Sequence, residues 1–266
     1  MLLDRHALYE RAVQTPEHDV ELLEQLFRAR RRRAPRSLRE DFCGTARVSI
    51  AWVGSDDERE AVAIDLDREV LERGRRHARA ELEHDERARL RIVRADVRRP
   101  SERAFDLVLA PNFSWACFHD ASTLGAYLDG ARRALEHDGL LVLELFGGPA
   151  LRRPLRHQHR HGDFTYVWEH RSHDPAREIT DARIHFELDD GRRIDDAFRY
   201  EYRAWRPRQV ETLLRERGFG RVELLVEDAR GALVAREREP AADSWNGYLI
   251  ADARGTARRR HRTAAV

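Results

Sequence analysis

The sequence contains no lysine, so all 49 of its basic residues are arginine. No side chain can therefore act as a Schiff base or as an amine whose pKa is tuned for general-base catalysis. Cysteine is scarce as well: Cys43 and Cys117 are the only two, and neither belongs to a CxxC or CxxH spacing. This pattern argues against a disulfide scaffold, a zinc site and an iron–sulfur site.

Long apolar runs are also missing. No stretch approaches the roughly 20 apolar residues of a membrane span, and the opening MLLDRHALYE lacks the profile of a signal peptide. Together with the sparse cysteines, this predicts a cytoplasmic protein with no membrane partner. The net charge is only +1 although 36% of the residues are charged. A global field that would attract nucleic acid or anionic lipid is therefore excluded.

A chain of 266 residues with 41% hydrophobic residues can form one large α/β domain with an insertion. Short apolar segments alternate with helical patterns through its first half. Strands are expected at 37–42, 61–64, 90–95, 105–110 and 140–146, helices at 46–53, 68–82 and 123–135, and a turn at 137–139. Short apolar strands alternating with helices predict a Rossmann-like, doubly wound, mostly parallel sheet covered on both faces.

The flanking segments follow other patterns. Residues 4–30 read as one or two amphipathic helices with a break at 15–17, and extended segments at 164–170, 179–188 and 193–203 predict an antiparallel insertion after the fifth strand. A helix at 207–217 and strands at 221–227 and 245–251 complete the sheet. We expect five parts: an N-terminal helical lid (1–34), a core (35–148), an insertion (149–205), a C-terminal return to the core (206–252) and a disordered basic tail (253–266).

Polar and small residues end the predicted parallel strands. They are the Cys43-Gly44-Thr45 turn, Asp65, Asp96 and Asn112. In an open doubly wound sheet these strand ends share one edge, where ligands bind. Gly44 lets the backbone approach a ligand closely. Asp65 follows it by about twenty residues, the spacing at which a carboxylate on the second strand meets ribose hydroxyls.

This set resembles the class I S-adenosylmethionine-dependent methyltransferases. Their first motif is an acid, two residues and Cys-Gly-Thr-Gly; here Glu40 precedes Cys43-Gly44-Thr45-Ala46, with Phe42 and Ala46 at two positions that are usually glycine. AVAIDLD, Asp96-Val97 and FDLVLA before Asn112 resemble the next three motifs. LEHDGLLVLELF and RPRQVETLLRERGFGRVELL resemble the fifth strand and the late helix of small-molecule members. LYERAVQTPE and LREDFCGTARVSIAW are similar to one bacterial subgroup.

The resemblance implies S-adenosylmethionine as cofactor and assigns its contacts. Glu40 and the backbone around Gly44 would hold the amino acid end, Asp65 the ribose, and Asp96 with Val97 the adenine. Asn112 and Phe113 would border the sulfonium, while Tyr9 and Gln14 close over the cofactor. The full expected set is Tyr9, Gln14, Arg39, Glu40, Phe42, Cys43, Gly44, Asp65, Leu66, Asp96, Val97, Asn112 and Phe113.

The charges of the first loop favour this cofactor over a dinucleotide. A pyrophosphate needs a glycine-rich turn that presents backbone amides, whereas this turn follows Glu40 and Asp41 and lacks GxGxxG. Two like unit charges about 4 Å apart repel by about 4 kcal/mol at an effective dielectric constant of 20. The same carboxylates suit an ammonium and a sulfonium.

The predicted insertion is rich in aromatic residues, which could hold a cationic or planar acceptor. Tyr166, Trp168, Tyr200 and Tyr202 are the candidate substrate contacts, although inward faces of a small sheet would have the same composition. Methyl transfer is an in-line displacement and needs a base only for a protonated acceptor. We expect no obligatory triad, and His119, Glu169 and His170 are the candidate bases. We expect residues 157–161, with alternate histidines, to be a solvated loop and not a metal site.

Three functions remain open. The first is methyl transfer to a small molecule. The second is methylation of RNA or protein, which the arginines at 28–33 and 258–262 favour. Runs of like charge, however, usually lie on a solvent-exposed face of the protein. The third is a non-catalytic S-adenosylmethionine-binding module, suggested by Phe42. A homodimer is possible on this evidence, and a nicotinamide dehydrogenase is disfavoured.

Overall fold

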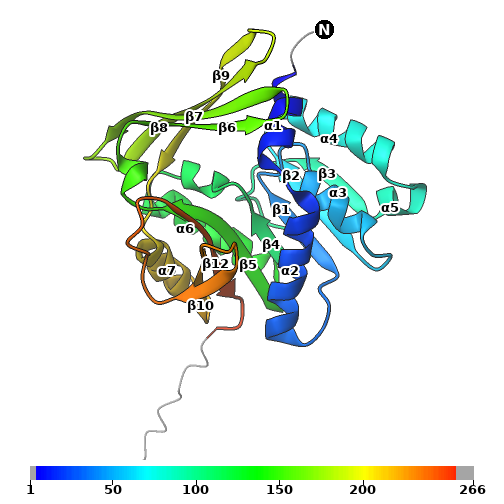
Figure 1. Ribbon diagram of the computed structural model, residues 1–266. Helices are drawn as coiled ribbons and strands as arrows, with labels where there is room; N and C mark the ends of the chain where they lie inside the picture. Colours follow the sequence, from blue (N-terminus) through cyan, green and yellow to red (C-terminus); the bar gives the residue numbers. More distant parts are fainter. Residues whose placement is uncertain (1–3, 256–266) are drawn as a thin grey trace, which may run out of the picture.

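The computed structural model describes residues 4–255 (Figure 1). Two sheets and the helices around them make up this part of the chain. The helices are α1 (Arg5–Val13), α2 (Pro16–Arg31), α3 (Arg47–Gly54), α4 (Arg68–Glu81), α5 (His84–Ala88), α6 (Ala121–Arg133) and α7 (Pro207–Glu216), with 3-10 turns η1 (Ser114–Cys117) and η2 (Pro149–Arg152). The strands are β1 (Ser37–Asp41), β2 (Glu60–Asp65), β3 (Leu90–Arg94), β4 (Phe105–Ala110), β5 (Leu135–Gly147), β6 (Leu155–His161), β7 (Phe164–Asp174), β8 (Ile179–Leu188), β9 (Arg193–Arg203), β10 (Val222–Glu227), β11 (Leu233–Arg236) and β12 (Trp245–Asp252).

The main sheet is mostly parallel. Its eight strands lie in the order β11-β10-β12-β5-β4-β1-β2-β3. The run from β5 to β3 is parallel throughout, and β12 joins it antiparallel to β5. The order reverses between β1 and β4, so the carboxyl ends of these strands flank the switch point at which such sheets bind ligands.

Apolar strand residues are buried on both faces of this sheet. One core cluster joins Leu38, Leu107 and Val142 to side chains of α2 and α3, and another joins Val108 and Leu141 to α6 and α7. Burial on both sides is why these strands read as continuous apolar runs and not as alternating ones. The predicted doubly wound fold is confirmed.

The four-stranded antiparallel sheet, β6-β7-β8-β9, stands over one end of the main sheet (Figure 1). Helix α1 lies beside it and connects it to α4. Leu8 packs with Phe164 and Phe186 of the small sheet, while Arg73 of α4 pairs with Asp4 and Glu10. The expected insertion after the fifth strand is confirmed, and its aromatic face is held against the rest of the molecule.

Several predicted elements match closely, and two predictions were wrong. The helix break at 15–17 and the strands at 105–110, 179–188 and 193–203 are confirmed. The turn expected at 137–139 is part of β5, because a register shift between Phe105 and Leu107 absorbs these residues as a bulge. The solvated loop expected at 157–161 is the edge strand β6: its side chains are exposed or half-exposed, but its backbone pairs with β7.

The remaining expectation about chain ends falls mostly outside the structure. Of the tail predicted to be disordered, residues 256–266 lie outside the described residues. Within 4–255, no helix has the length and apolar character that crossing a membrane requires.

Candidate functional site

The loop after β1 has left-handed backbone at three alternate positions. Phe42, Gly44 and Ala46 have φ angles of 57°, 52° and 57°. These are the three positions that hold glycine in the motif that the sequence resembles. The chain thus keeps the glycine-type backbone with two side chains that normally avoid it, at a cost of about 1–2 kcal/mol for each.

The side chain of Phe42 packs away from the loop backbone. Its ring lies 5.8 Å from the rings of both Phe118 and Tyr127, between centroids, within the core cluster beside α6. Packing of this kind offsets part of the backbone strain. The large residue at the first glycine position is therefore accommodated by the core.

A buried ion pair supports this loop from beneath. Arg39 donates to Asp41 over 2.7 Å and to the carbonyl of Val97 over 2.5 Å, and the hydroxyl of Tyr127 donates to Asp41 over 3.1 Å. The Arg39 and Asp41 side chains are 1% and 0% exposed. Arg39, expected among the cofactor contacts, instead joins β1 to the loop that follows β3.

Asp65 connects the end of β2 to the first loop. One carboxylate oxygen accepts a hydrogen bond from the backbone N–H of Gly44 over 2.9 Å, and the other accepts one from Asp67. The next residue, Leu66, is 62% exposed. An exposed apolar side chain beside a carboxylate offers a ligand both an apolar contact surface and a hydrogen-bond acceptor.

Asp96 and Val97 follow β3 on the same edge of the sheet. Asp96 holds the guanidinium of Arg98 by a pair of short contacts, and this pairing lowers the pKa of Asp96. Val97 is buried at 5% exposure. A ligand amino group at Asp96 would share this carboxylate with Arg98.

Carboxyl groups gather where α2, β1 and β5 meet. Burial raises the pKa of Glu40 to about 8, that of Glu144 to about 7 and that of Asp19 to about 6. The negative charge of Asp19 acts on both of the others, and Asp65 acts on Glu40. We call Asp19, Glu40, Asp65 and Glu144 the acidic cluster.

No member of the acidic cluster forms an ion pair with another residue of the chain from 4 to 255. Glu40, only 2% exposed, accepts hydrogen bonds from the N–H of Ser49 over 2.8 Å and its hydroxyl over 2.5 Å. Buried carboxylates are normally paired. An unpaired group of them indicates that a cationic ligand completes this site.

Two further buried oxygens near this edge lack partners among the described residues. They are Oγ1 of Thr45, in the first loop, and Oε1 of Gln14, at the C-cap of α1. Buried oxygens are rarely left unpaired in native proteins. The open acceptors, the acidic cluster and the left-handed loop together fit a cofactor that brings an ammonium, a sulfonium and hydroxyl groups.

Sequence reasoning missed Asp19 and Glu144. Glu144 is a lone acid inside the apolar strand segment LLVLELF, which is a signal of a functional residue that could have been used. Asp19 lies among the charges of α2 and gives no such signal, because only the packing of α2 against the sheet half-buries it.

The loop after β4 is strained next to this cluster. Asn112 and Phe113 have φ angles of 52° and 44°, and the N–H of Asn112 donates to Oε2 of Glu144 over 2.6 Å. The ring of Phe113 then lies 4.2 Å from that of Phe146, between centroids. Strained backbone that persists is typical of functional sites.

The predicted acceptor residues share one face of the antiparallel sheet. Trp168 lies 5.9 Å from Phe113 and 6.1 Å from Tyr200, and Tyr202 lies 5.2 Å from Phe146, between ring centroids. Tyr166 continues this face, where it contacts Phe186. We call Phe113, Phe146, Tyr166, Trp168, Tyr200 and Tyr202 the aromatic face.

Tyr9 closes this face from α1. Its ring lies 5.1 Å from that of Phe198, between centroids, and its hydroxyl is hydrogen-bonded to Tyr200. Burial raises the pKa of Tyr9, and the charge of Glu144 raises it further. Tyr9 therefore lies between the aromatic face and the acidic cluster.

The three candidate bases lie in different surroundings. His170 is buried: Nδ1 lies 3.1 Å from the carbonyl of Ala150, and Nε2 lies 2.8 Å from both the indole N–H of Trp168 and the hydroxyl of Tyr202. With both nitrogens engaged, it positions the aromatic face. Glu169 pairs with His185 on the opposite face. His119 contacts the carbonyl of Glu201.

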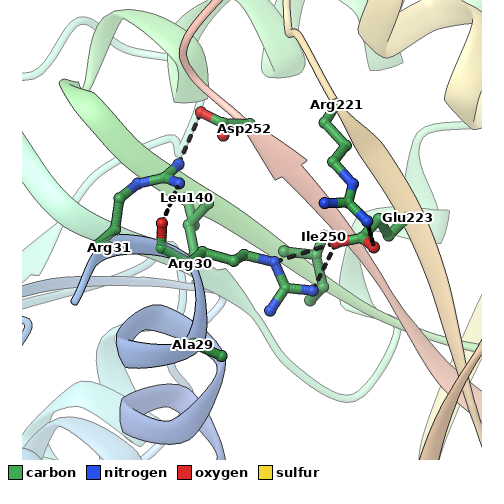
Figure 2. A pocket seen from close by; sticks show the side chains of 8 residues that line it. All are labelled: Ala29, Arg30, Arg31, Leu140, Arg221, Glu223, Ile250 and Asp252. Carbon is green, nitrogen blue, oxygen red and sulfur yellow. Dashed lines mark hydrogen bonds and ion pairs between the residues drawn. The ribbon is translucent and has the colours of Figure 1, made fainter.

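A cavity of about 210 Å³ lies at the opposite edge of the main sheet (Figure 2). Figure 2 shows Arg30 and Arg221 directed at Glu223, and Arg31 directed at Asp252. Each arginine of this cavity is thus paired with a carboxylate of the chain. Because Arg30 and Arg221 share the single carboxylate of Glu223, the lining keeps a net positive charge, which does not suit a cationic ligand.

Within residues 4–255, no three His, Cys, Asp or Glu side chains are grouped so that they could hold a metal ion. The histidines of β6 extend along an edge strand whose side chains are mostly exposed.

Known proteins with a similar sequence segment or the same fold are methyltransferases. Residues 41–143 match a family described as "Methyltransferase domain". A search of curated protein sequences gives no match. Solved structures with the same fold include an S-adenosylmethionine-dependent methyltransferase from Clostridium acetobutylicum, at 17% identity and TM-score 0.69 over 93% of this chain and 96% of that chain.

Two further structures cover nearly the whole of both chains. DesVI from Streptomyces venezuelae has 17% identity and TM-score 0.70 over 94% of this chain and 99% of its own. CalS10 from Micromonospora echinaspora has 14% identity and TM-score 0.69 over 95% and 98%. The matched segment spans the first loop, Asp65, Asp96 and Asn112. The chain therefore contains a methyltransferase domain at residues 41–143 and shares the fold of these S-adenosylmethionine-dependent methyltransferases.

Proposed function

We propose that this enzyme transfers the methyl group of S-adenosylmethionine to a small molecule held between the aromatic face and the carboxyl ends of β4 and β5. The observation that carries the proposal is the enclosure of this space: Phe113, at the end of β4, contacts Phe146, Trp168 and Tyr202. These rings come from β5, β7, β9 and the loop after β4, and they would block the approach of a folded polymer to the end of β4.

The position of the acidic cluster suggests how the cofactor would be oriented in this site. When bound, S-adenosylmethionine supplies an electrophilic methyl group on a positively charged sulfur. Glu40 and the backbone from Cys43 to Ala46 would hold its amino acid end, and Asp65 its ribose. Asp96, Val97 and Leu66 would receive the adenine, and Asn112 with Phe113 would border the sulfonium. Gln14 and Tyr9 would close the site from α1.

The aromatic face contributes exclusion of water and positioning of the acceptor. Displacement at a methyl carbon requires the nucleophile in line with the breaking bond, and holding that geometry supplies a large part of the acceleration. His170 fixes Trp168 and Tyr202 through its two hydrogen bonds. We accordingly propose that residues 149–205 act as an acceptor lid and residues 1–34 as a cofactor lid.

The proteins of known structure that share this fold support a small-molecule acceptor. CalS10 is described as an amino pentose methyltransferase, KedS8 as a sugar N-methyltransferase and MtfA as a glycopeptide N-methyltransferase. At 14–21% identity they share the fold with this chain. Sugars and glycosylated small molecules are therefore the first acceptors to test.

The alternative of RNA methylation loses one of its two supports. Of the arginines at 28–33, Arg28 pairs with Glu24, Arg30 with Glu223, Arg31 with Asp252, and Arg33 with Asp106 and Asp138. Charges neutralised in this way release few counterions on binding a polyanion. The other support, residues 258–262, lies outside the described residues.

The experiment that tests the proposal has two arms. Ligands carried through purification are identified by mass spectrometry, and S-adenosylhomocysteine formation is then measured with a panel of amino sugars and their hydroxyl counterparts. We expect copurified S-adenosylmethionine or its demethylated product, and turnover on members of the panel. No binding of S-adenosylmethionine at millimolar concentration would refute the proposal.

A further inference from the structure

Glu144 is a carboxyl group within an otherwise apolar strand segment of the main sheet. It lies on β5 one residue beyond Leu143, the last partner of β4, at the carboxyl edge of the parallel strands. Its neighbours Leu143 and Leu145 are buried and apolar. A carboxyl group at such a place carries a desolvation cost that an apolar residue would avoid. No ion pair among residues 4–255 compensates this cost.

The hydrogen bonds of Glu144 leave one oxygen open. Oε2 accepts from the N–H of Asn112 over 2.6 Å, which fixes the carboxyl group against the strained loop of Asn112 and Phe113. Oε1 accepts no hydrogen bond from any described residue. The carboxyl group is therefore held in place while keeping a free acceptor.

The groups around Glu144 come from four elements. The negative charges of Asp19 on α2 and Glu227 on β10 raise the pKa of Glu144. The charge of Glu144 in turn raises the pKa of Tyr9 on α1 and of Tyr248 on β12. No cationic side chain of residues 4–255 is among these neighbours. Burial and this negative surrounding raise its pKa to about 7, which suits a proton acceptor near neutral pH.

The aromatic face adds the second half of an ammonium site. Tyr9 lies between Glu144 and the rings of Tyr200 and Phe198, and Phe113 follows Asn112 directly. Aromatic rings and a carboxylate around one space bind an alkylammonium through cation–π contacts and charge attraction. A neutral alcohol acceptor would donate a hydrogen bond to the open oxygen but would gain neither the charge attraction nor the cation–π contacts.

From this arrangement we infer that the acceptor is an amine and that Oε1 of Glu144 takes its proton before methyl transfer. The inference rests on the proposed function and names its substrate class. The ammonium passes one proton to the Glu144 carboxylate, and the freed nitrogen lone pair forms a bond to the methyl carbon. The carbon–sulfur bond breaks, its electron pair stays on sulfur as a thioether, and the product leaves as the methylated ammonium. The proton on Glu144 then passes to water.

Two ligands test the inference without an identified acceptor. Sinefungin carries a primary amine where the cofactor carries its methyl group, and S-adenosylhomocysteine has no group there. The ratio of their dissociation constants isolates the effect of an amine beside the acceptor space, since contacts to the adenosine and amino acid parts cancel. Calorimetric titrations at pH 8.5 give this ratio for the wild type, Glu144→Gln and Glu227→Gln.

We expect the wild type to bind sinefungin at least tenfold more tightly than S-adenosylhomocysteine. Glu144→Gln should reduce this preference at least fivefold and change S-adenosylhomocysteine affinity less than twofold. Glu227→Gln changes an exposed carboxyl on β10, which β12 separates from β5, and should keep the preference. An unchanged preference in Glu144→Gln, or none in the wild type, overturns the inference.

A pH series on the wild type covers the case in which Glu144→Gln does not fold. Lowering the pH from 8.5 to 5.5 protonates Glu144 and should remove most of the preference for sinefungin, whereas a constant ratio contradicts the inference. Failure of the proposed function gives a different result, because the wild type then binds neither ligand.

Discussion

The proposed cofactor half and the proposed acceptor half of the site satisfy their polar groups in opposite ways. In the cofactor half, at the ends of β1, β2 and β5, the acidic cluster has no countercharge among residues 4–255, and Thr45 and Gln14 keep unpartnered oxygens. In the acceptor half, His170, Trp168 and Tyr202 satisfy one another. The carboxyl groups of the first half need a cationic ligand to balance their charge, whereas the side chains of the second half are already hydrogen-bonded to one another.

The difference indicates what each half contributes. An unpaired group of buried carboxyls destabilises the free protein and is relieved when a positively charged ligand binds. A surface of mutually bonded rings binds its ligand weakly but holds it in one orientation. Changes in the first half should alter cofactor affinity and stability, and changes in the second should alter turnover.

Trp168→Ala tests this division with the largest expected effect. The substitution removes the ring contacts of Trp168 to Phe113, Phe146 and Tyr200. It also removes the indole N–H that donates a hydrogen bond to His170. We expect turnover on the acceptor found in the panel to fall about a hundredfold because positioning is lost, with a less than twofold change in the dissociation constant of S-adenosylmethionine. Val167→Ala, on the other face of the same strand, should retain turnover. A large loss of cofactor affinity in Trp168→Ala would show that the halves are not separable.

The pH dependence of stability reports on the cofactor half. Burial raises the pKa of Glu40 from 4.5 to about 8, so the folded protein binds a proton in this window that the unfolded chain has released. Stability of the free protein therefore falls as pH rises from 4.5 through 8. We expect the Tm to drop by at least about 5 °C between pH 5.5 and 8.5.

Glu40→Gln should remove at least half of that drop, and saturating S-adenosylmethionine should reduce it in the wild type. Thermal melts followed by circular dichroism make both comparisons. A Tm that rises with pH over this range would mean that the cluster is compensated by groups of the protein itself.

Ala46→Gly gives the smallest effect and tests the strain in the first loop. Ala46 and Ala78 are both buried, at 0% and 6% exposure, but Ala46 has a φ of 57° and Ala78 lies inside α4. Glycine relieves about 1–2 kcal/mol of left-handed strain at the first position and costs about 1 kcal/mol at the second. In urea unfolding, Ala46→Gly should be less destabilising than Ala78→Gly by about 2–3 kcal/mol. Equal losses would show that the loop is unstrained.

Sequence predicted the arrangement at the parallel strand ends better than that of the antiparallel sheet, for physical reasons. Short apolar strands that end in Gly44, Asp65, Asp96 and Asn112 fix both the sheet and the edge at which these residues meet, because strand polarity alone decides which ends converge. Asp19 could not be found in this way, since its place depends on how α2 packs against the sheet.

The acceptor half depends on tertiary contacts between distant segments. The alternation of Tyr166, Trp168 and His170 predicts a shared face, but not that this face covers Phe113. Equally, no pattern distinguishes His170, engaged at both nitrogens, from a free base. Residues 157–161 lack apolar side chains, so their strand, β6, is determined by pairing with β7 alone.

The central claim is that carboxylates at adjacent strand ends bind S-adenosylmethionine, and Asp65 tests it most directly. Calorimetric titration of S-adenosylmethionine should give at least a tenfold weaker dissociation constant for Asp65→Ala, a loss of about 1.4 kcal/mol. Asp67→Asn, which keeps a cap for α4 two residues away, should bind like the wild type. Unchanged affinity in Asp65→Ala would contradict the account.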